Sequence, residues 1–331
     1  MSGLLDDVLT LPDQLRWGLD LDPDGMASER GMVLLGMGGS AMAATVGSLA
    51  ATSSVPIDVH RSYGLPGWAG ESGASVIAVS YSGNTEEVLS GVDAAFSAGL
   101  DLSIITSGGR LGQIAGERDL PIVLVPGGMQ PRAGVGYQAS AVTMVLGASG
   151  VIADAKSELG EAADVVDELL ADGAGPAVKH GTAIATDLAG RTAVIYGGFG
   201  VGATAAYRWK TQLNENAKVP AYSGVVPEMN HNELEGWHDD TGKGFAIVYL
   251  RDEQDHPRIK SRLELSEALI GEVATNAGTV ASTGTGVIAR LSSLAVVGDI
   301  ASLVVAEAAG TDPTPVHTIE GFKQSLGKED Q

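Results

Sequence analysis

The chain has 331 residues, which is enough for two domains that each bury a core. Apolar residues make up 44% and charged residues 18%, a globular composition that excludes a largely disordered chain. The net charge of −21 argues against nucleic acid and anionic membranes as partners, and the absence of cysteine excludes a disulfide scaffold, a thiolate metal site and a cysteine nucleophile.

The N-terminal segment, residues 1–22, is predicted to be helical. Its apolar residues recur at helical spacing, at Leu4, Leu5, Val8, Leu9, Leu11 and Leu15. No basic residue precedes Arg16, so the composition is not that of a signal peptide. The longest apolar stretches, such as 140–151, are too short and too rich in Ala and Gly to span a membrane. We therefore expect a cytoplasmic protein with no membrane partner.

Short apolar runs alternate with helical stretches through the first half of the chain. The runs are 32–35, 57–60, 76–80, 102–106 and 122–125, and helical spacing is clear at 86–98 and 110–117. This alternation predicts an α/β domain with a parallel sheet and helices on both faces. Residues 140–170 are then predicted to be helical, ending in a Gly-rich segment at 171–176.

The second half repeats the pattern. Runs at 193–196 and 245–250 are each followed by helical spacing. Residues 194–197 align with 33–36 of the first half, and residues 246–248 align with 77–79. Further elements are a run at 288–294 and helices at 300–308 and 316–326. The chain is therefore divided into an N-terminal helical segment (1–22), a first α/β unit (23–152), a helical linker (153–176) and a second unit with a C-terminal helix (177–331).

A glycine-rich turn follows the first run, with the sequence Gly36-Met37-Gly38-Gly39-Ser40-Ala41. Glycines allow a ligand to approach the backbone, and the N-terminus of the following helix offers N–H groups to an anion. The turn also fits G-x-G-x-x-A, with Asp58 where a dinucleotide ribose could bind. An anion site, a dinucleotide site and a plain turn all remain open on this motif alone.

A second turn, Ser80-Tyr81-Ser82-Gly83-Asn84-Thr85-Glu86, also joins a run to a helix. Helix capping accounts for Thr85 and the acids that follow it, but it leaves Ser80 and Ser82 unexplained. Hydroxyl and backbone donors together can surround a phosphate. Both turns leave a parallel sheet at its carboxyl edge, where ligands of such folds bind. A dinucleotide fold needs no second cradle there, so we favour a phosphate site.

These two motifs, Gly38-Gly39-Ser40 and the turn from Ser80 to Glu86, resemble the phosphosugar-binding SIS (sugar isomerase) domain. The resemblance implies two flavodoxin-like SIS domains, with a sugar phosphate held by Gly38, Gly39, Ser40, Ser80, Ser82 and Thr85. Further segments, at 131–133, 213–218, 227–233 and 312–323, resemble the bifunctional phosphoglucose/phosphomannose isomerases. Only the first unit keeps the cradle, since Leu250-Arg251-Asp252-Glu253 replaces the serine-rich turn in the second.

The resemblance assigns roles to four residues. Glu215 would move a proton between C1 and C2 through a cis-enediolate, and Arg132 would stabilise the charge that develops. His231 and Lys323 would open the sugar ring, with His231 contributed by the partner subunit of a homodimer. Each also has a structural interpretation: a solvated helix-end glutamate, a surface arginine, a structural histidine, and a lysine that only orients a hydroxyl.

The predicted activity is isomerisation of glucose 6-phosphate and mannose 6-phosphate to fructose 6-phosphate, with no organic cofactor and no metal. His231, Glu233 and His238 match no common metal-binding spacing. The family's tolerance of both C2 epimers implies a small residue, here among Thr311, Thr314, Val316 and Thr318. A non-catalytic phosphosugar sensor and a nicotinamide-dependent oxidoreductase are the alternative functions.

Overall fold

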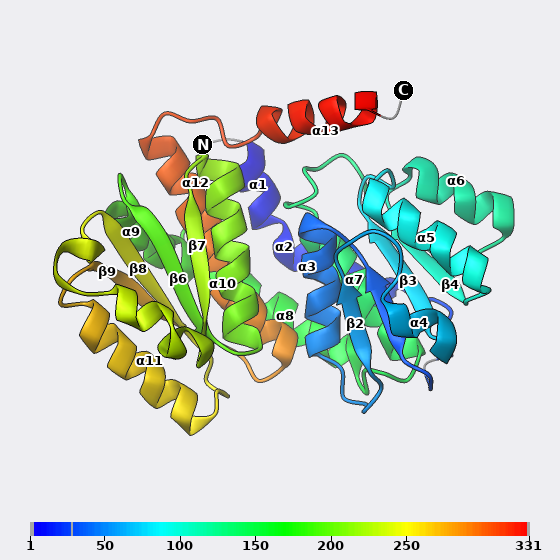
Figure 1. Ribbon diagram of the computed structural model, residues 1–331, viewed down its shortest axis with the longest axis horizontal. Coiled ribbons are helices and arrows are strands. Elements are labelled where there is room, and N and C mark those ends of the chain that lie inside the picture. The colour runs from blue at the N-terminus through cyan, green and yellow to red at the C-terminus, as the bar shows by residue number, and fades with distance from the viewer. Residues whose placement is uncertain (1–2, 28, 330–331) are drawn as a thin grey trace.

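The computed structural model describes residues 3–27 and 29–329, which form two α/β domains with one parallel sheet each (Figure 1). The first sheet has five strands in the order β2-β1-β3-β4-β5. They are β1 (Met32–Leu35), β2 (Ile57–His60), β3 (Ser75–Ser80), β4 (Leu102–Thr106) and β5 (Ile122–Leu124). The five runs predicted in the first half are thus confirmed as strands.

Helices cover both faces of this first sheet, which buries every residue of β1 and β3. They are α3 (Gly38–Leu49), α4 (Gly67–Ser72), α5 (Glu86–Ala98), α6 (Gly109–Arg118) and α7 (Val135–Ala148). A strand buried on both faces must be apolar along its whole length, which explains the continuous rather than alternating runs.

The second sheet has the order β7-β6-β8-β9. Its strands are β6 (Thr192–Gly198), β7 (Ala221–Val226), β8 (Phe245–Arg251) and β9 (Thr275–Ala281), and its helices include α9 (Pro176–Leu188), α10 (Val201–Gln212), α11 (Pro257–Ile270) and α12 (Val287–Ala308). In both sheets the first strand pairs with the second on one side and with the third on the other. This equivalence confirms the internal repeat.

The structure differs from the sequence prediction in several elements. The N-terminal segment forms α1 (Gly3–Leu9) and α2 (Leu11–Trp17) rather than one helix, with Pro12 in the first turn of the second. The predicted helix at 140–170 is divided into α7 and α8 (Ala155–Leu170). Strands β7 and β9 were not predicted, because glycine and polar residues interrupt their apolar patterns.

A single helix, α12, replaces the separate elements predicted at 288–294 and 300–308. Among the described residues it is the only helix long and apolar enough to cross a membrane. Of its apolar 18-residue stretch, 89% is buried inside the protein. It packs against α8, α9 and α10. The indole of Trp209 on α10 donates from Nε1 to the carbonyl of Leu294 (2.8 Å). The apolar residues of α12 are therefore explained by the position of this helix in the hydrophobic core.

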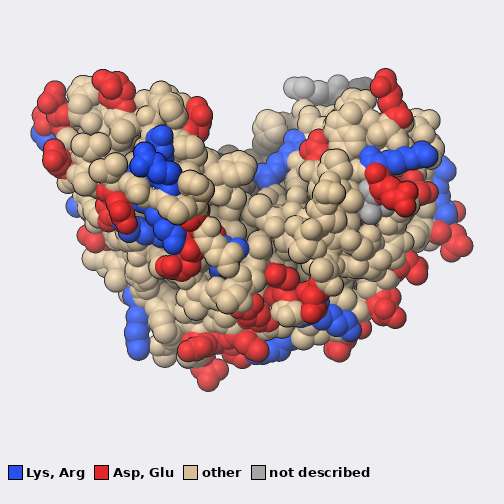
Figure 2. All heavy atoms as spheres, turned by 90° about the horizontal axis from the view of Figure 1, so that it is seen from below, with Lys and Arg blue, Asp and Glu red and all other residues tan. Residues whose placement is uncertain are grey.

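The two domains share one continuous hydrophobic core. Helix α8, in the segment predicted as a linker, packs against α2 and α7 as well as α12. Figure 2 shows the lower face of the molecule, with two lobes separated by a hollow and carboxylates spread over both. The last helix, α13 (His317–Glu329), extends from the second domain along the upper side in Figure 1.

Candidate active site

The first glycine-rich turn lies at the carboxyl edge of the first sheet, between β1 and α3. Gly38 adopts a left-handed conformation, with φ of +51°. Gly39 packs closely on the loop that carries Arg132. A Cβ at this position would stand 3.0 Å from the carbonyl oxygen of Pro131 and 3.5 Å from Cα of Arg132. Glycine is therefore needed to bring this turn against Arg132.

Ser40 is buried and its hydroxyl links several parts of the site. It donates to Oε1 of Gln138 (2.6 Å) and accepts the backbone N–H of Tyr81 (3.2 Å). The Ser40 hydroxyl donates one hydrogen bond and accepts another, and in this way it links the first turn to the second. An anion at this turn would meet backbone N–H groups at the start of α3, although the N–H of Ser40 already donates to the carbonyl of Met37 (3.0 Å).

The second turn, between β3 and α5, also lies at this edge. The hydroxyls of Ser80 and Thr85 are hydrogen-bonded to each other (2.8 Å), and Ser80 Oγ accepts the N–H of Gly83 (3.2 Å). Ser82 is exposed, and its Oγ accepts the N–H of Asn84 (3.2 Å). The Thr85 side chain does not cap α5. The hydroxyls of Ser80 and Thr85 thus lie next to each other, beside the backbone N–H groups of the turn.

The shape of the second turn depends on Gly83, whose φ is +68°. A Cβ there would stand 1.9 Å from the carbonyl oxygen of Gly108. The turn is further tied to the loop after β4 because Asn84 Oδ1 accepts the N–H of Arg110 (2.9 Å). Neighbouring loops at the sheet edge therefore hold this turn in place.

The side chain of Arg132 is only 5% exposed and reaches from the first domain to the second. Its Nε donates to Oδ1 of Asn216 (2.7 Å), and its Nη2 donates to the carbonyls of Pro313 (2.7 Å) and Thr314 (3.0 Å). Burial lowers the pKa of Arg132, whereas the carboxylate of Glu215 raises it. The guanidinium stays charged, since its ordinary pKa is above 12.

Glu215 meets Arg132 although the two residues belong to different domains. It lies in a π-helical turn, η3 (Leu213–Ala217), that extends the C-terminal end of α10. Its Oε2 is 3.5 Å from Nη1 of Arg132, and its side chain is 29% exposed. A carboxylate that is partly open to solvent beside a buried cation can exchange a proton with a ligand in the same space. The structure thus places Glu215, Arg132 and the glycine-rich turn together.

Several residues that support the site were not singled out from the sequence. Asn216, next to Glu215, is fully buried and also donates from Nδ2 to Ser302 Oγ (2.9 Å). Arg208 forms a buried ion pair with Asp299 (2.7 Å) and donates to the backbone carbonyl of Arg132 (3.3 Å). The signal for these residues in the sequence is a polar or charged side chain at a helix position that faces the core. Burial of such a side chain is costly unless it is paired.

His231 lies far from Glu215 within one chain. It ends the turn η4 (Glu228–His231), which follows the carboxyl end of β7, whereas Glu215 precedes the amino end of this strand. The length of β7 alone separates these edges by about 17 Å, at about 3.3 Å per residue. His231 is exposed, and the neighbouring Asn230 is held by Nδ2 donating to Ser266 Oγ (2.8 Å).

Lys323 lies on α13, whose residues from 317 to 325 are all exposed. The helix follows the segment in which Pro313 and Thr314 contact Arg132. Figure 1 shows it on the upper side of the molecule, toward the first domain. Lys323 is thus on an element that starts at the site, with its side chain open to solvent.

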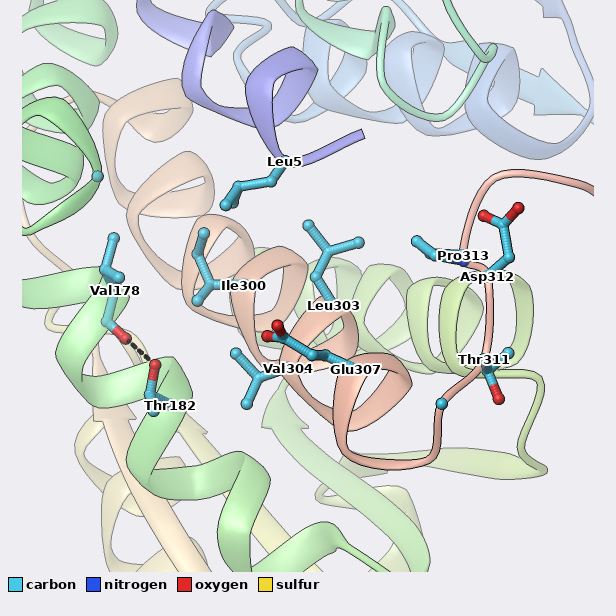
Figure 3. Close-up of a pocket in the computed structure, with 12 residues that line it drawn as sticks. Leu5, Val178, Thr182, Ile300, Leu303, Val304, Glu307, Thr311, Asp312 and Pro313 are labelled. Atoms are coloured by element: carbon cyan, nitrogen blue, oxygen red, sulfur yellow. Dashed lines mark hydrogen bonds between the residues drawn. The ribbon is translucent and has the colours of Figure 1, made fainter. Parts of the chain in front are cut away.

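A separate apolar cavity of about 560 Å³ is lined in part by the segment 310–313 (Figure 3). Its walls include Leu5 of α1, Val178 of α9 and Ile300 of α12. None of the six predicted phosphate-binding residues lines it. Its charged lining residues are Glu307 and Asp312, which would repel a phosphate, so it is not the candidate site.

The candidate metal ligands of the sequence, His231, Glu233 and His238, do not form a cluster. Within residues 3–27 and 29–329, no group of three or more His, Asp or Glu side chains is arranged to hold a metal ion. Glu233 instead accepts a hydrogen bond from the hydroxyl of Tyr196 (3.2 Å).

In the second domain, acidic residues occupy the position equivalent to the serine-rich turn. Asp252 forms a buried ion pair with Arg290. Asp255 lies against Gly198. A Cβ added to Gly198 would stand 2.5 Å from the carboxylate of Asp255. Burial, together with the neighbouring Asp252, raises the pKa of Asp255 to about 6, and the Asp252 backbone bond lowers it in part. A carboxylate at this position would repel a phosphate.

Comparison with solved structures identifies the fold. The C-terminal domain of glucosamine-fructose-6-phosphate aminotransferase from Francisella tularensis superimposes with a TM-score of 0.73 at 14% identity, covering 94% of this chain and 98% of that one. Tagatose-6-phosphate ketose/aldose isomerase from Escherichia coli has a TM-score of 0.67 at 15% identity, covering 95% of each chain. Residues 177–326 match the model of the bacterial phospho-glucose isomerase C-terminal SIS domain. The protein is thus of the double SIS-domain class.

Sequence relatives define the family more narrowly. A bifunctional phosphoglucose/phosphomannose isomerase of Caldicellulosiruptor bescii is 32% identical over 98% of this chain and 99% of its own length. Another, from Aquifex aeolicus, is 34% identical over 96% of both chains. The chain belongs to the bifunctional phosphoglucose/phosphomannose isomerase family, as the sequence motifs predicted.

Proposed function

We propose that this chain interconverts glucose 6-phosphate and mannose 6-phosphate with fructose 6-phosphate, using Glu215 as the base. Isomerisation of hexose 6-phosphates is the activity of its family. The observation that carries the residue assignment is the 3.5 Å approach of the Glu215 carboxylate to the buried Arg132 guanidinium, next to the glycine-rich turn. Both the general base and the fixed positive charge that the reaction needs are therefore available in one place.

In the proposed reaction the two turns hold the phosphate, and C1 and C2 of the opened sugar lie toward Glu215. The carboxylate removes the proton from C2 of the aldose, the C–H electron pair forms the C1–C2 double bond, and the carbonyl oxygen gains negative charge next to Arg132. Return of the proton to C1, with re-formation of a C=O bond at C2 and transfer of the O2 proton to the negatively charged O1, produces the ketose. Because the enediolate carries its charge on oxygen, a cation fixed at that oxygen lowers the barrier.

Ring opening is assigned to His231 and Lys323, with His231 supplied by the partner subunit of a homodimer. The separation of His231 from Glu215 along β7 supports this assignment, because one chain alone leaves His231 at the wrong edge of the sheet. Among the residues considered for epimer tolerance, Thr314 is the one whose carbonyl accepts a hydrogen bond from Arg132.

The proposal is tested with coupled assays that use glucose 6-phosphate and mannose 6-phosphate as separate substrates. Glu215→Gln keeps the size of the side chain and removes its basicity, so kcat should fall by about 100- to 10,000-fold on both substrates. Glu117→Gln, at an exposed position on α6, is the control. Activity on one epimer only would reduce the function to a single isomerase.

Full turnover by Glu215→Gln would refute the assignment of the base. Binding of fructose 6-phosphate by the wild type without turnover would favour a sensing role. NADH binding that fructose 6-phosphate does not affect would favour an oxidoreductase.

A further inference from the structure

Lys218 occupies a backbone conformation that ordinarily selects glycine. It follows the turn η3 with φ of 59° and ψ of 31°, and its N–H donates to the carbonyl of Leu213. Left-handed conformation at the end of a helix is unfavourable for a residue with a Cβ, and glycine is the usual occupant. Lysine occupies this position although glycine would fit the backbone more readily.

The ammonium of Lys218 contacts two backbone carbonyls of the site. It donates to the carbonyl of Glu215 and to that of Pro313 (3.2 Å). The same Pro313 carbonyl accepts a hydrogen bond from Nη2 of Arg132 (2.7 Å). One carbonyl of the C-terminal segment is thus shared by two cations, and one of these cations also holds the backbone of the base.

The charges around Lys218 fit this arrangement. Partial burial and the nearby Arg132 lower the pKa of Lys218, while Asp312 and Glu215 raise it. Its outer side lines a cavity together with Glu215 and with Val316 and Thr318 at the start of α13. Lys218 therefore stands between the turn that carries the base and the segment that leads to Lys323.

We propose that Lys218 is a positioning residue that clamps the Glu215 turn to the segment 312–314, so that the base, Arg132 and α13 keep their relative places. The inference rests on the proposed function, since it concerns the alignment of the same base. It predicts that loss of the ammonium loosens the segment 311–316 and misaligns Glu215, without weakening the fold.

The test compares Lys218→Gly, Lys218→Arg and a matched control, Asp119→Gly. Asp119 is exposed, ends α6 and has φ of 52°, so its replacement makes the same change of backbone far from the site. Lys218→Gly should lower kcat for fructose 6-phosphate by about 10- to 100-fold, as expected for a displaced catalytic group, with KM changed less than about threefold. Lys218→Arg should recover most of this loss, and Asp119→Gly should match the wild type.

Hydrogen exchange provides a readout that does not depend on isomerase activity. Amides in 311–316 should exchange faster in Lys218→Gly than in the wild type or Asp119→Gly, while the two glycine variants have similar thermal midpoints. An active wild type with unchanged kcat and exchange in Lys218→Gly would overturn the inference and leave the proposed function intact. A thermal midpoint that falls along with kcat would also overturn it. An inactive wild type would instead count against the proposed function.

Discussion

Asn216 holds the guanidinium of Arg132 through a hydrogen bond of 2.7 Å between its Oδ1 and the arginine Nε. This bond crosses from the second domain to the first and ties the cation to the residue next to Glu215. Asn216 has no exposed surface, and its amide also donates to Ser302 Oγ. The distance between Glu215 and Arg132 therefore depends on a buried amide rather than on the two charges alone.

Replacing Asn216 by leucine should impair both stability and catalysis. A buried Arg132 Nε without an acceptor should cost about 1–3 kcal/mol in the free energy of unfolding, and kcat should fall by about tenfold or more as the guanidinium shifts. Urea titration and the coupled assay measure the two effects. Ser302→Ala removes only the other partner of the amide, so it should retain kcat. Equal kcat losses in the two variants would argue against a specific role for the Arg132 contact.

Replacing Gly83 by alanine should weaken phosphate binding. The added Cβ would collide with the carbonyl of Gly108 and displace the turn that carries Ser80 and Ser82. We expect KM for fructose 6-phosphate to rise by about tenfold or more, since each charge-assisted hydrogen bond contributes about 1.5–3 kcal/mol. Gly99→Ala is matched to it, with φ of +66° but no atom near the added Cβ. An unchanged KM in Gly83→Ala would place the phosphate elsewhere.

Two inactive variants should restore activity when their subunits are mixed. If each site combines Glu215 of one chain with His231 of the partner, a heterodimer of Glu215→Gln and His231→Ala contains one intact site. After subunit exchange at equal amounts, about a quarter of the wild-type activity should return, because half of the dimers are mixed and each has one working site. The coupled assay after denaturation and refolding together measures this. Activity no higher than the average of the separate variants would show that His231 acts within its own chain.

The stability of the second domain should depend on pH through Asp255. Its pKa is raised from 3.8 to about 6, so the folded state binds the proton more tightly than the unfolded chain does. This contribution to stability is present below about pH 4 and is lost as pH rises through about 6. Asp255→Asn removes the effect, so the stability of this variant relative to the wild type should increase by about 1–2 kcal/mol over that interval, a value reduced for partial exposure.

Urea titrations at several pH values test the Asp255 prediction. Asp101→Asn, which changes an exposed carboxyl group before β4, should show a much flatter difference from the wild type. A relative stability of Asp255→Asn that stays constant from pH 4 to pH 7, or decreases, would contradict the assignment of a raised pKa.

The two turns proposed to bind the phosphate can be located in the sequence because their signals are local. A buried strand, a turn of glycine and serine and a helix follow one another within about ten residues, and parallel strands place all such turns at one edge. In the structure the Ser40 hydroxyl donates a hydrogen bond to Oε1 of Gln138. This contact cannot be predicted from the residues near Ser40 in the sequence, because Gln138 belongs to α7, which packs on α3 only in the folded protein.

The amino-acid sequence by itself determined the α/β class, the repeated unit, the strands of the first sheet and the position of the two turns, because periodicity and turn residues act over short distances. Family motifs added Glu215, Arg132, His231 and Lys323. Only the tertiary structure decided which of these meet: the packing of both domains around α12 brings the end of α10 to Arg132 and leaves His231 at the opposite edge of the second sheet. Contacts between distant segments, such as those of Pro313 with Arg132 and Lys218, depend on that packing and leave no local pattern in the chain.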